Sequence, residues 1–254
     1  MSGHSKWATI KHKKAATDAK RGRAFSRLIK EITIASRLGG GDIDANPRLR
    51  SAIAAAKAEN MPNDNIERAV RRGTGQIPGL VLEEATFEGY APGGVAVLVE
   101  TTTDNRTRTV NELRHIFTRW SGNLGENGCV AWMFHKKAFL SLPRGRVDED
   151  SLLGIVLDAG AEDVRDDGTN WEVIGPPESL EPLRSALEAQ SLKPETAEIT
   201  MLPQSTVQVE GGTAQQVLRL LEALEEHDDV QHVYANFDIA EKEIEEAVAT
   251  SGSE

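Results

Sequence analysis

The densest group of chemically active side chains in the sequence is a run of cations near the N-terminus. The first thirty residues contain nine Lys or Arg side chains and a single acid, Asp18. A Lys-rich segment neutralises phosphates and releases the counterions condensed on nucleic acid, and an aromatic ring among the cations can stack on a base or enter a groove. We therefore predict a nucleic-acid-binding site made of Lys6, Trp7, Lys11, His12, Lys13, Lys14, Lys20, Arg21, Arg23, Arg27 and Lys30.

The charge of the chain is strongly asymmetric. Its 254 residues carry a formal net charge of −11, which would argue against a polyanionic partner if the charge were evenly spread. Residues 1–75, however, hold 16 Lys or Arg against 7 Asp or Glu, and the following residues hold 13 against 33. A basic segment on an acidic body favours an approach to nucleic acid with the basic end first. The alternative is a solvated basic face without a partner. Three further cations, Arg68, Arg71 and Arg72, extend the positive surface.

The other candidate groups do not assemble into a catalytic or metal site. The sequence lacks the phosphate-loop, dinucleotide-binding, nucleophile-elbow and zinc-protease motifs. None of its six His residues is paired at metal-ligand spacing, and Cys129 is expected to be a small buried side chain rather than a nucleophile. We predict Gly122–Gly128 to be a structural turn and Asp148–Asp150 to be the acidic first turn of a helix. The sequence therefore predicts no enzyme activity, no catalytic residue, no metal and no cofactor.

The composition also bears on the compartment. No stretch approaches the roughly 18 apolar residues of a membrane span, and a single cysteine excludes a disulfide framework. The basic start of the chain lacks the apolar run of a secretory signal. We expect a cytoplasmic protein with no membrane partner.

Residues 1–77 are predicted to form a three-helix bundle that follows an irregular basic arm. Apolar residues recur at three- and four-residue spacing over three segments, so each segment has one apolar face and the three faces can share one small core. Glycine or proline follows each segment, and a capping residue precedes the second and the third. The predicted helices run from about Ala15 to Gly39, from Asn46-Pro47 to Met61, and over Ile66–Arg72 with Asp64 and Glu67 as a capping box.

Strand and helix patterns alternate from residue 78 onward. Two βαββαβ series can be read, which is the order of a ferredoxin-like domain. One series lies within residues 136–203, and the other lies in its flanks, residues 78–135 plus 204–238. An insertion at a hairpin tip is well tolerated, so we predict that the first domain is inserted in the second. The alternative is one larger mixed sheet.

The outer series defines which strands should pair. After a first strand over Leu82–Glu88 and a turn over Ala91–Gly94, its six elements are expected at Val95–Thr101, Thr107–Thr118, Val130–Phe134, Thr206–Val209, Thr213–Glu226 and Val230–Phe237. The predicted protein is thus an α+β multidomain chain, with a basic helical domain, two ferredoxin-like α+β domains and an acidic tail over residues 239–254.

Four blocks of the sequence resemble the YebC/PmpR family, in order along the chain. The resemblance is most specific over residues 1–135, where these blocks lie, and it extends over essentially the whole chain. The blocks are residues 1–7 with 10–14 (MSGHSKW and IKHKK), 61–69 with 73–75 (MPNDNIERA and GTG), 88–96 with 103–106 (EGYAPGGVA and TDNR), and 122–128 with 130–134 (GNLGENG and VAWMF). The Trp120-Ser121 pair departs from the turn that is usual in the family, and this affects only the local loop.

The resemblance implies a three-domain protein of the bacterial cytoplasm without enzyme activity. Members of the family are described as transcriptional regulators that bind promoter DNA, and others as translation factors that act on the ribosome. Duplex DNA, ribosomal RNA and tRNA are therefore all expected partners of the basic segment. No helix-turn-helix is evident in the sequence, which favours recognition of shape and backbone over base readout. The remaining hypothesis is a protein–protein adaptor that binds its partner through the acidic α+β domains.

Overall fold

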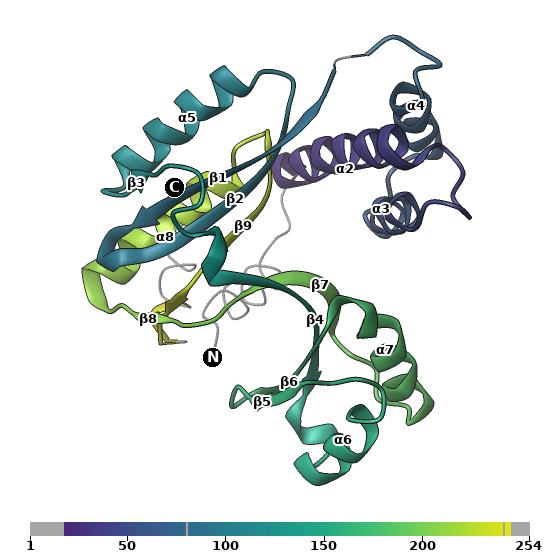
Figure 1. Cartoon of the computed structure of the whole chain (residues 1–254), viewed down its shortest axis with the longest axis vertical. Coiled ribbons are helices and arrows are strands. Elements are labelled where there is room, and N and C mark those ends of the chain that lie inside the picture. The colour runs from purple at the N-terminus through teal and green to yellow at the C-terminus, as the bar shows by residue number, and fades with distance from the viewer. Residues whose placement is uncertain (1–17, 80, 241, 245–254) are drawn as a thin grey trace.

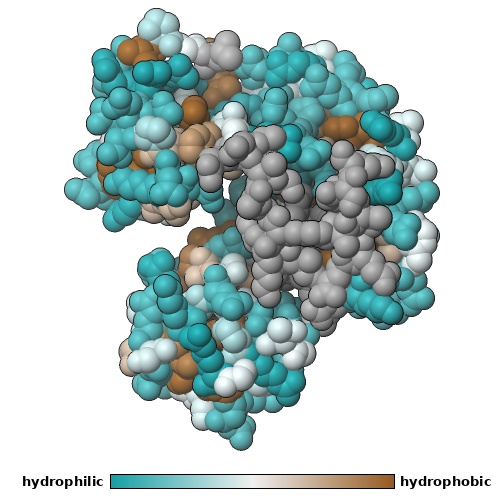
Figure 2. All heavy atoms as spheres, turned by 180° about the vertical axis from the view of Figure 1, so that it is seen from behind, coloured by the Kyte–Doolittle hydropathy of each residue, from teal (hydrophilic) through white to brown (hydrophobic). Residues whose placement is uncertain are grey.

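The computed structural model describes residues 18–79, 81–240 and 242–244, with side chains described from residue 22 onward. The predicted basic arm over residues 1–14 and most of the predicted acidic tail lie outside the described residues. Three units follow one another in space: a helical unit, a central sheet with two helices, and a second sheet with two helices (Figure 1). Figure 2 shows the helical unit and the second sheet unit as separate lobes with a notch between them on the face in view.

The predicted three-helix bundle is confirmed. Its buried core contains residues from all three helices, including Ile32, Leu49 and Ile66. The third helix begins at Asn63, three residues before the predicted start, because Pro62 takes the N-cap position and Asp64 and Glu67 form no side-chain cap there. The helices are α2 (Asp18–Gly39), α3 (Pro47–Ala58) and α4 (Asn63–Gly73).

Asn46 fixes the corner between α2 and α3. Its Oδ1 accepts a hydrogen bond from the Leu49 amide at 3.0 Å, which caps α3 as predicted. Its Nδ2 donates to the carbonyl oxygens of Ala35 and Gly40, each at 2.8 Å, and thereby satisfies two acceptors at the end of α2. One side chain, 5% exposed, thus joins the end of one helix to the start of the next.

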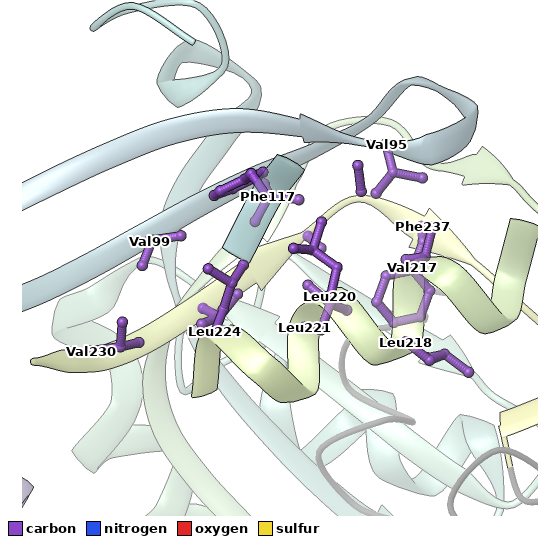
Figure 3. Packing of buried hydrophobic residues seen from close by; sticks show 14 of the residues in the cluster. Val95, Val99, Phe117, Val217, Leu218, Leu220, Leu221, Leu224, Val230 and Phe237 are labelled. Carbon is purple, nitrogen blue, oxygen red and sulfur yellow. The ribbon is translucent and has the colours of Figure 1, made fainter. Parts of the chain in front are cut away.

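The central unit is an antiparallel sheet with the strand order β3-β1-β2-β9. Two helices cover one face, and their apolar residues interlock with those of the sheet around Phe117, Leu221 and Val99 (Figure 3). A smaller cluster on the opposite face contains Leu98 and Tyr234. The elements are β1 (Glu83–Ala91), β2 (Val95–Thr103), α5 (Arg106–Arg119), β3 (Asn123–Leu124), α8 (Gly211–Glu225) and β9 (Val230–Ala235).

The strand membership of the central sheet differs from the prediction, although the α+β class is confirmed. The segment expected as a strand over Val130–Phe134 contains a short 3₁₀ helix, Ala131–Met133. The segment expected over Thr206–Val209 forms β8 (Val207–Gln208), which pairs with β10 (Phe237–Asp238) in a separate two-stranded sheet. Instead, β1 lies beside β2, because strands joined by a tight turn are usually neighbours in a sheet.

A buried carboxylate explains why residues 128–131 do not form a strand. The Glu88 side chain accepts hydrogen bonds from the amides of Gly128, Val130 and Ala131 at 2.6–2.7 Å. Burial alone would raise the pKa of Glu88, but these three amides outweigh it and lower the pKa below its usual value. Amides that bind the carboxylate cannot also join a strand ladder, so this segment stays a loop.

The second sheet unit has the predicted ferredoxin-like order. Its strands run β5-β6-β4-β7, with every neighbouring pair antiparallel. The two strands of each βαβ unit have one other strand between them in the sheet, as in a split βαβ fold. It has its own core around Leu140, Trp171 and Leu183. The elements are β4 (Phe134–Pro143), α6 (Glu149–Val156), β5 (Asp163–Asp166), β6 (Asn170–Gly175), α7 (Leu180–Ala189) and β7 (Thr196–Pro203).

The chain enters and leaves this unit at one place. Phe134 at the start of β4 pairs with Pro203 at the end of β7. The domain limits at residues 77, 135 and 203 stay a prediction. Within the part of the chain that the structure describes, no helix is both long and apolar enough to span a membrane.

Replacement of Asn46 by Ala is expected to lower the free energy of unfolding by about 3 kcal/mol, because α3 loses its cap and two carbonyls at the end of α2 lose their donors. Urea unfolding followed by circular dichroism measures this loss. Asn105→Ala is the matched control, since the Asn105 side chain caps α5 with a single bond to the Arg108 amide and its loss should cost about 1 kcal/mol. Equal losses for the two variants would contradict the role assigned to Asn46.

Candidate nucleic-acid interface

The predicted site divides at the start of α2. Lys6, Trp7, Lys11, His12, Lys13 and Lys14 lie outside the described residues, and of Lys20 and Arg21 only the helical backbone is described. The three remaining side chains, Arg23, Arg27 and Lys30, follow one another at four- and three-residue spacing. This spacing puts them on one face of α2. That face is turned toward the loop between α8 and β9.

Arg23 and Lys30 form ion pairs with this loop. The Arg23 guanidinium lies 3.2 Å from a carboxylate oxygen of Glu226. The Lys30 ammonium lies 2.6 Å from Oδ1 of Asp229 and donates to the carbonyl oxygen of Asp228 at 2.9 Å. These cations therefore neutralise carboxylates of the protein itself rather than forming an open positive surface.

Arg27 lies between these two pairs and is partly buried. Burial lowers its pKa below the ordinary value, and the acidic side chains at the end of α8 and in the following loop, Glu225 foremost, act in the opposite direction. Its Nε is buried without a hydrogen-bond partner among the described residues. Arg27 thus adds positive charge to the contact between α2 and the loop.

Asp229 is the centre of this contact. Its side chain is 4% exposed and accepts hydrogen bonds from Lys30, from Arg108 at 2.7 Å and from Thr109 at 2.7 Å. The hydroxyl of Thr103 adds a fourth at 3.1 Å. Burial would raise the pKa of Asp229, but the donors and the two cations hold it well below its usual range. One carboxylate therefore ties together α2, the end of β2, α5 and the loop before β9.

A second charged cluster also joins the helical unit to the central sheet. The Arg48 guanidinium of α3 lies 2.7 Å from Glu31 on α2 and 2.6 Å from Glu84 on β1. The hydrogen bonds that Arg48 donates to these two carboxylates raise its pKa. Arg37 adds a hydrogen bond to the carbonyl oxygen of Leu82 at 2.5 Å. The helical unit is therefore joined to the central sheet mainly by charged and polar contacts.

A groove of about 950 Å³ lies at the junction of α2, α5 and the loop before β9. Three of its residues, Glu112, His227 and Asp229, lie close enough together to hold a metal ion. Their ligand atoms are already engaged. Nε2 of His227 faces Glu112 at 2.8 Å, Nδ1 accepts the Asp229 amide at 3.1 Å, and Asp229 is bound by two cations. The arrangement fits a network of ion pairs better than a metal centre.

Sequence reasoning missed the acidic and α5 members of this junction. Asp229 and Lys30 are 199 residues apart, and Arg108 and Asp229 are 121 apart, so no local spacing connects them. The one available signal was the density of acids in the Glu225–Asp229 segment opposite a basic N-terminal region. The junction has a structural role, because its ion pairs orient the helical unit. Arg23 and Lys30 are engaged in these pairs and do not form part of an open cationic surface.

Other cations of the helical unit are exposed to solvent. All three arginines of α4 are exposed, namely Arg68, Arg71 and Arg72. None of them forms an ion pair with another residue that the structure describes. Arg50 and Lys57 of α3 are exposed in the same way, and Arg50 donates to the backbone carbonyl of Asp44.

Asp229→Asn is expected to lower the free energy of unfolding at pH 7 by about 2 kcal/mol, because the partly buried Lys30 and the exposed Arg108 lose the buried carboxylate that pairs with them. The native pKa of Asp229 lies below the unfolded value of about 3.9. Its stabilisation is therefore complete above about pH 5 and is lost as the pH falls through 3.9 toward the native pKa. The difference between wild type and variant should then shrink below about pH 4.

Urea unfolding at several pH values between 7 and 3 measures this dependence. Asp228→Asn is the control, because Asp228 is exposed and contributes its backbone carbonyl to Lys30. If Asp229→Asn kept the full acid sensitivity of the wild type, the carboxylate would not be the charged centre of the junction.

Comparison with known proteins finds matching family models and similar relatives over nearly the whole chain. Residues 5–76 match the family model of the TACO1/YebC protein N-terminal domain, and residues 82–237 match that of the TACO1/YebC second and third domain. A protein of Acidobacterium capsulatum named "Probable transcriptional regulatory protein" is 58% identical over 243 residues, 96% of this chain and 98% of that protein. One of Syntrophobacter fumaroxidans with the same name is 59% identical over 243 residues, with 95% and 98% covered.

A solved structure agrees with these matches. The crystal structure of a conserved hypothetical protein from Aquifex aeolicus has a TM-score of 0.76 and 50% sequence identity, covering 88% of this chain and 92% of that one. Family models over both parts, relatives along nearly the whole length and a shared fold lead to one conclusion. The chain is a member of the TACO1/YebC family.

Proposed function

We propose that the protein is a non-enzymatic regulator of gene expression that binds nucleic acid through its basic N-terminal region. The observation that carries the proposal is the separation of charge: 16 Lys or Arg against 7 Asp or Glu in residues 1–75, and 13 against 33 in the rest. The acidic units repel phosphate, so the helical unit is the part that can approach a polyanion.

The described contacts separate the cations of the basic region into two groups, those paired with acids of the protein and those that are not. Arg23 and Lys30 are engaged by Glu226 and Asp229, so they orient the helical unit. The residues proposed to contact phosphate are the lysines before α2, chiefly Lys11, Lys13 and Lys14, and the exposed arginines of α4. Trp7 is proposed to stack on a base or enter a groove.

Duplex DNA is the first candidate partner, because the named relatives are called probable transcriptional regulatory proteins. Structured RNA of the ribosome or a tRNA is the second. A lysine-rich segment reads backbone charge and shape rather than base edges, and that mode suits both. We propose a cytoplasmic site of action for either partner.

Changing Lys11, Lys13 and Lys14 together to Ala is expected to weaken binding and to flatten its salt dependence. On duplex DNA, each lysine that no longer neutralises a phosphate should reduce the slope of log affinity against log salt by about 0.9, so the triple substitution should reduce it by about 2.7. If the wild type neutralises about six phosphates, its affinity should fall roughly a thousandfold between 50 and 200 mM salt. Fluorescence anisotropy with labelled duplex DNA and labelled tRNA, and co-sedimentation with ribosomes, measure this at each salt concentration.

The control variant is Arg146→Gln with Lys193→Gln, which removes two exposed cations from the second sheet unit. It should leave both affinity and slope unchanged. Unchanged affinity and slope in the lysine variant, for every nucleic acid tested, would contradict the proposal. Crosslinking in cells followed by sequencing of the bound nucleic acid then separates a promoter from a ribosomal target.

A further inference from the structure

The outer edge of β1 is only partly covered. Its neighbour on this side, β3, pairs with Gly89 and Tyr90 alone, and Gly125 then donates its amide to the carbonyl oxygen of Glu88 at 2.8 Å. No other strand within the described ranges pairs with this edge, so residues 83–87 have no strand neighbour there. The helical unit touches only the start of the stretch, where Arg48 pairs with the Glu84 side chain. An open strand edge presents backbone groups that can pair with another chain.

The direction of these backbone groups follows from the pairing. The Glu88 carbonyl points away from β2, since it accepts from the β3 side. Backbone direction alternates along a strand with a period of two, so the N–H and C=O of Thr86 and Glu84 point outward as well. Thr86 is exposed, and the described chain gives its outward backbone groups no backbone partner. They are positioned to receive a further strand.

A groove of about 560 Å³ runs between this edge and α5. Three apolar residues lie along it: Phe87 of β1, Val110 of α5 and Leu124 of β3. Two arginines of α5, Arg106 and Arg114, line the helical side. The spacing of Arg106, Val110 and Arg114 puts all three on one flank of the helix, the flank that faces the β1 edge.

Both arginines are available to an incoming acid. Arg106 lies over the Phe87 ring at 5.7 Å, and Arg114 donates to the amide oxygen of Asn111 at 3.2 Å. Neither forms an ion pair with a described carboxylate. Of the two acids in the lining, Glu88 is bound by three backbone amides and Glu126 is left as the single free carboxylate. The charge of the helical side is therefore complementary to acidic side chains.

We propose that this groove binds an extended, acidic peptide segment of a partner protein, which adds a strand to the open edge of β1. An open edge beside a helix-lined groove is the geometry of peptide binding by strand addition, in which backbone bonds give affinity and alternate side chains give specificity. The acidic side chains lie on the face toward Arg106 and Arg114. The other face carries uncharged side chains, because Glu84 on that side of β1 is already paired with Arg48.

A peptide fits the edge better than a nucleic acid does. The outward C=O of Thr86 needs a donor and its N–H needs an acceptor at strand spacing, and a peptide backbone supplies both in register. A phosphate backbone offers acceptors alone. This site is separate from the basic N-terminal region, so peptide binding can be tested independently of the proposed nucleic-acid function.

Selection from a phage-displayed library of random heptapeptides on the full-length protein tests the proposal. The enriched peptides should be acidic at every second position, and their affinity is then measured by fluorescence anisotropy. Thr86→Pro should weaken binding by about tenfold or more, since it removes the outward N–H without touching the β2 ladder. Arg106→Gln with Arg114→Gln should weaken acidic peptides to a similar extent. Arg146→Gln with Lys193→Gln is the matched control and should change nothing.

Two results would overturn the proposal. One is the absence of enriched peptides, or enriched peptides whose affinity is the same for Thr86→Pro and the double arginine variant as for the wild type. The other is a loss of nucleic-acid affinity in Arg106→Gln/Arg114→Gln with no peptide binding, which would make the groove a nucleic-acid contact instead. Thermal unfolding of each variant shows that it is folded. If Thr86→Pro does not fold, the double arginine variant decides.

Discussion

A carboxylate buried at the meeting point of three elements must be neutralised there, and this requirement determines how the protein is assembled. Asp229 meets it with Lys30 from α2, Arg108 from α5 and two threonine hydroxyls. A buried ion pair contributes little net stability, because the cost of removing the charges from water offsets their attraction, but removal of one partner is costly because it leaves the other charge unpaired. The junction therefore fixes where the basic helical unit lies on the acidic body, and with it the direction from which a polyanion can approach.

Local patterns in the sequence were sufficient for much of the fold. The three helices follow from apolar spacing and from caps such as Asn46, and the second sheet unit follows from the order of its strands and helices. The central sheet could not be predicted in the same way. Whether residues 128–131 form a strand depends on Glu88, forty residues earlier, whose carboxylate binds their amides. No periodicity in either segment reveals that contact, and the β1–β2 hairpin takes the vacant position.

The candidate site shows the same limit in electrostatic terms. Composition revealed that the first thirty residues are basic, but it could not tell which cations face solvent and which face the protein's own acids. Lys30 looks like its neighbours in the sequence, yet it lies 2.6 Å from a carboxylate 199 residues away. The separation of charge joins the helical unit to the body through Arg23 and Lys30. In the proposed function the remaining cations bind the nucleic acid, and in the further inference the open edge of β1 binds a peptide.

A double-mutant cycle between Lys30 and Asp229 tests the central claim most directly. The free energy of unfolding is measured by urea titration at pH 7 for the wild type, Lys30→Met, Asp229→Asn and the combined variant. If the buried pair joins α2 to the body, the two substitutions should couple by about 1.5 kcal/mol or more, because the second loss costs little once the first has broken the pair. Additivity within about 0.3 kcal/mol would show that the two groups act independently, and the junction would not have the role described.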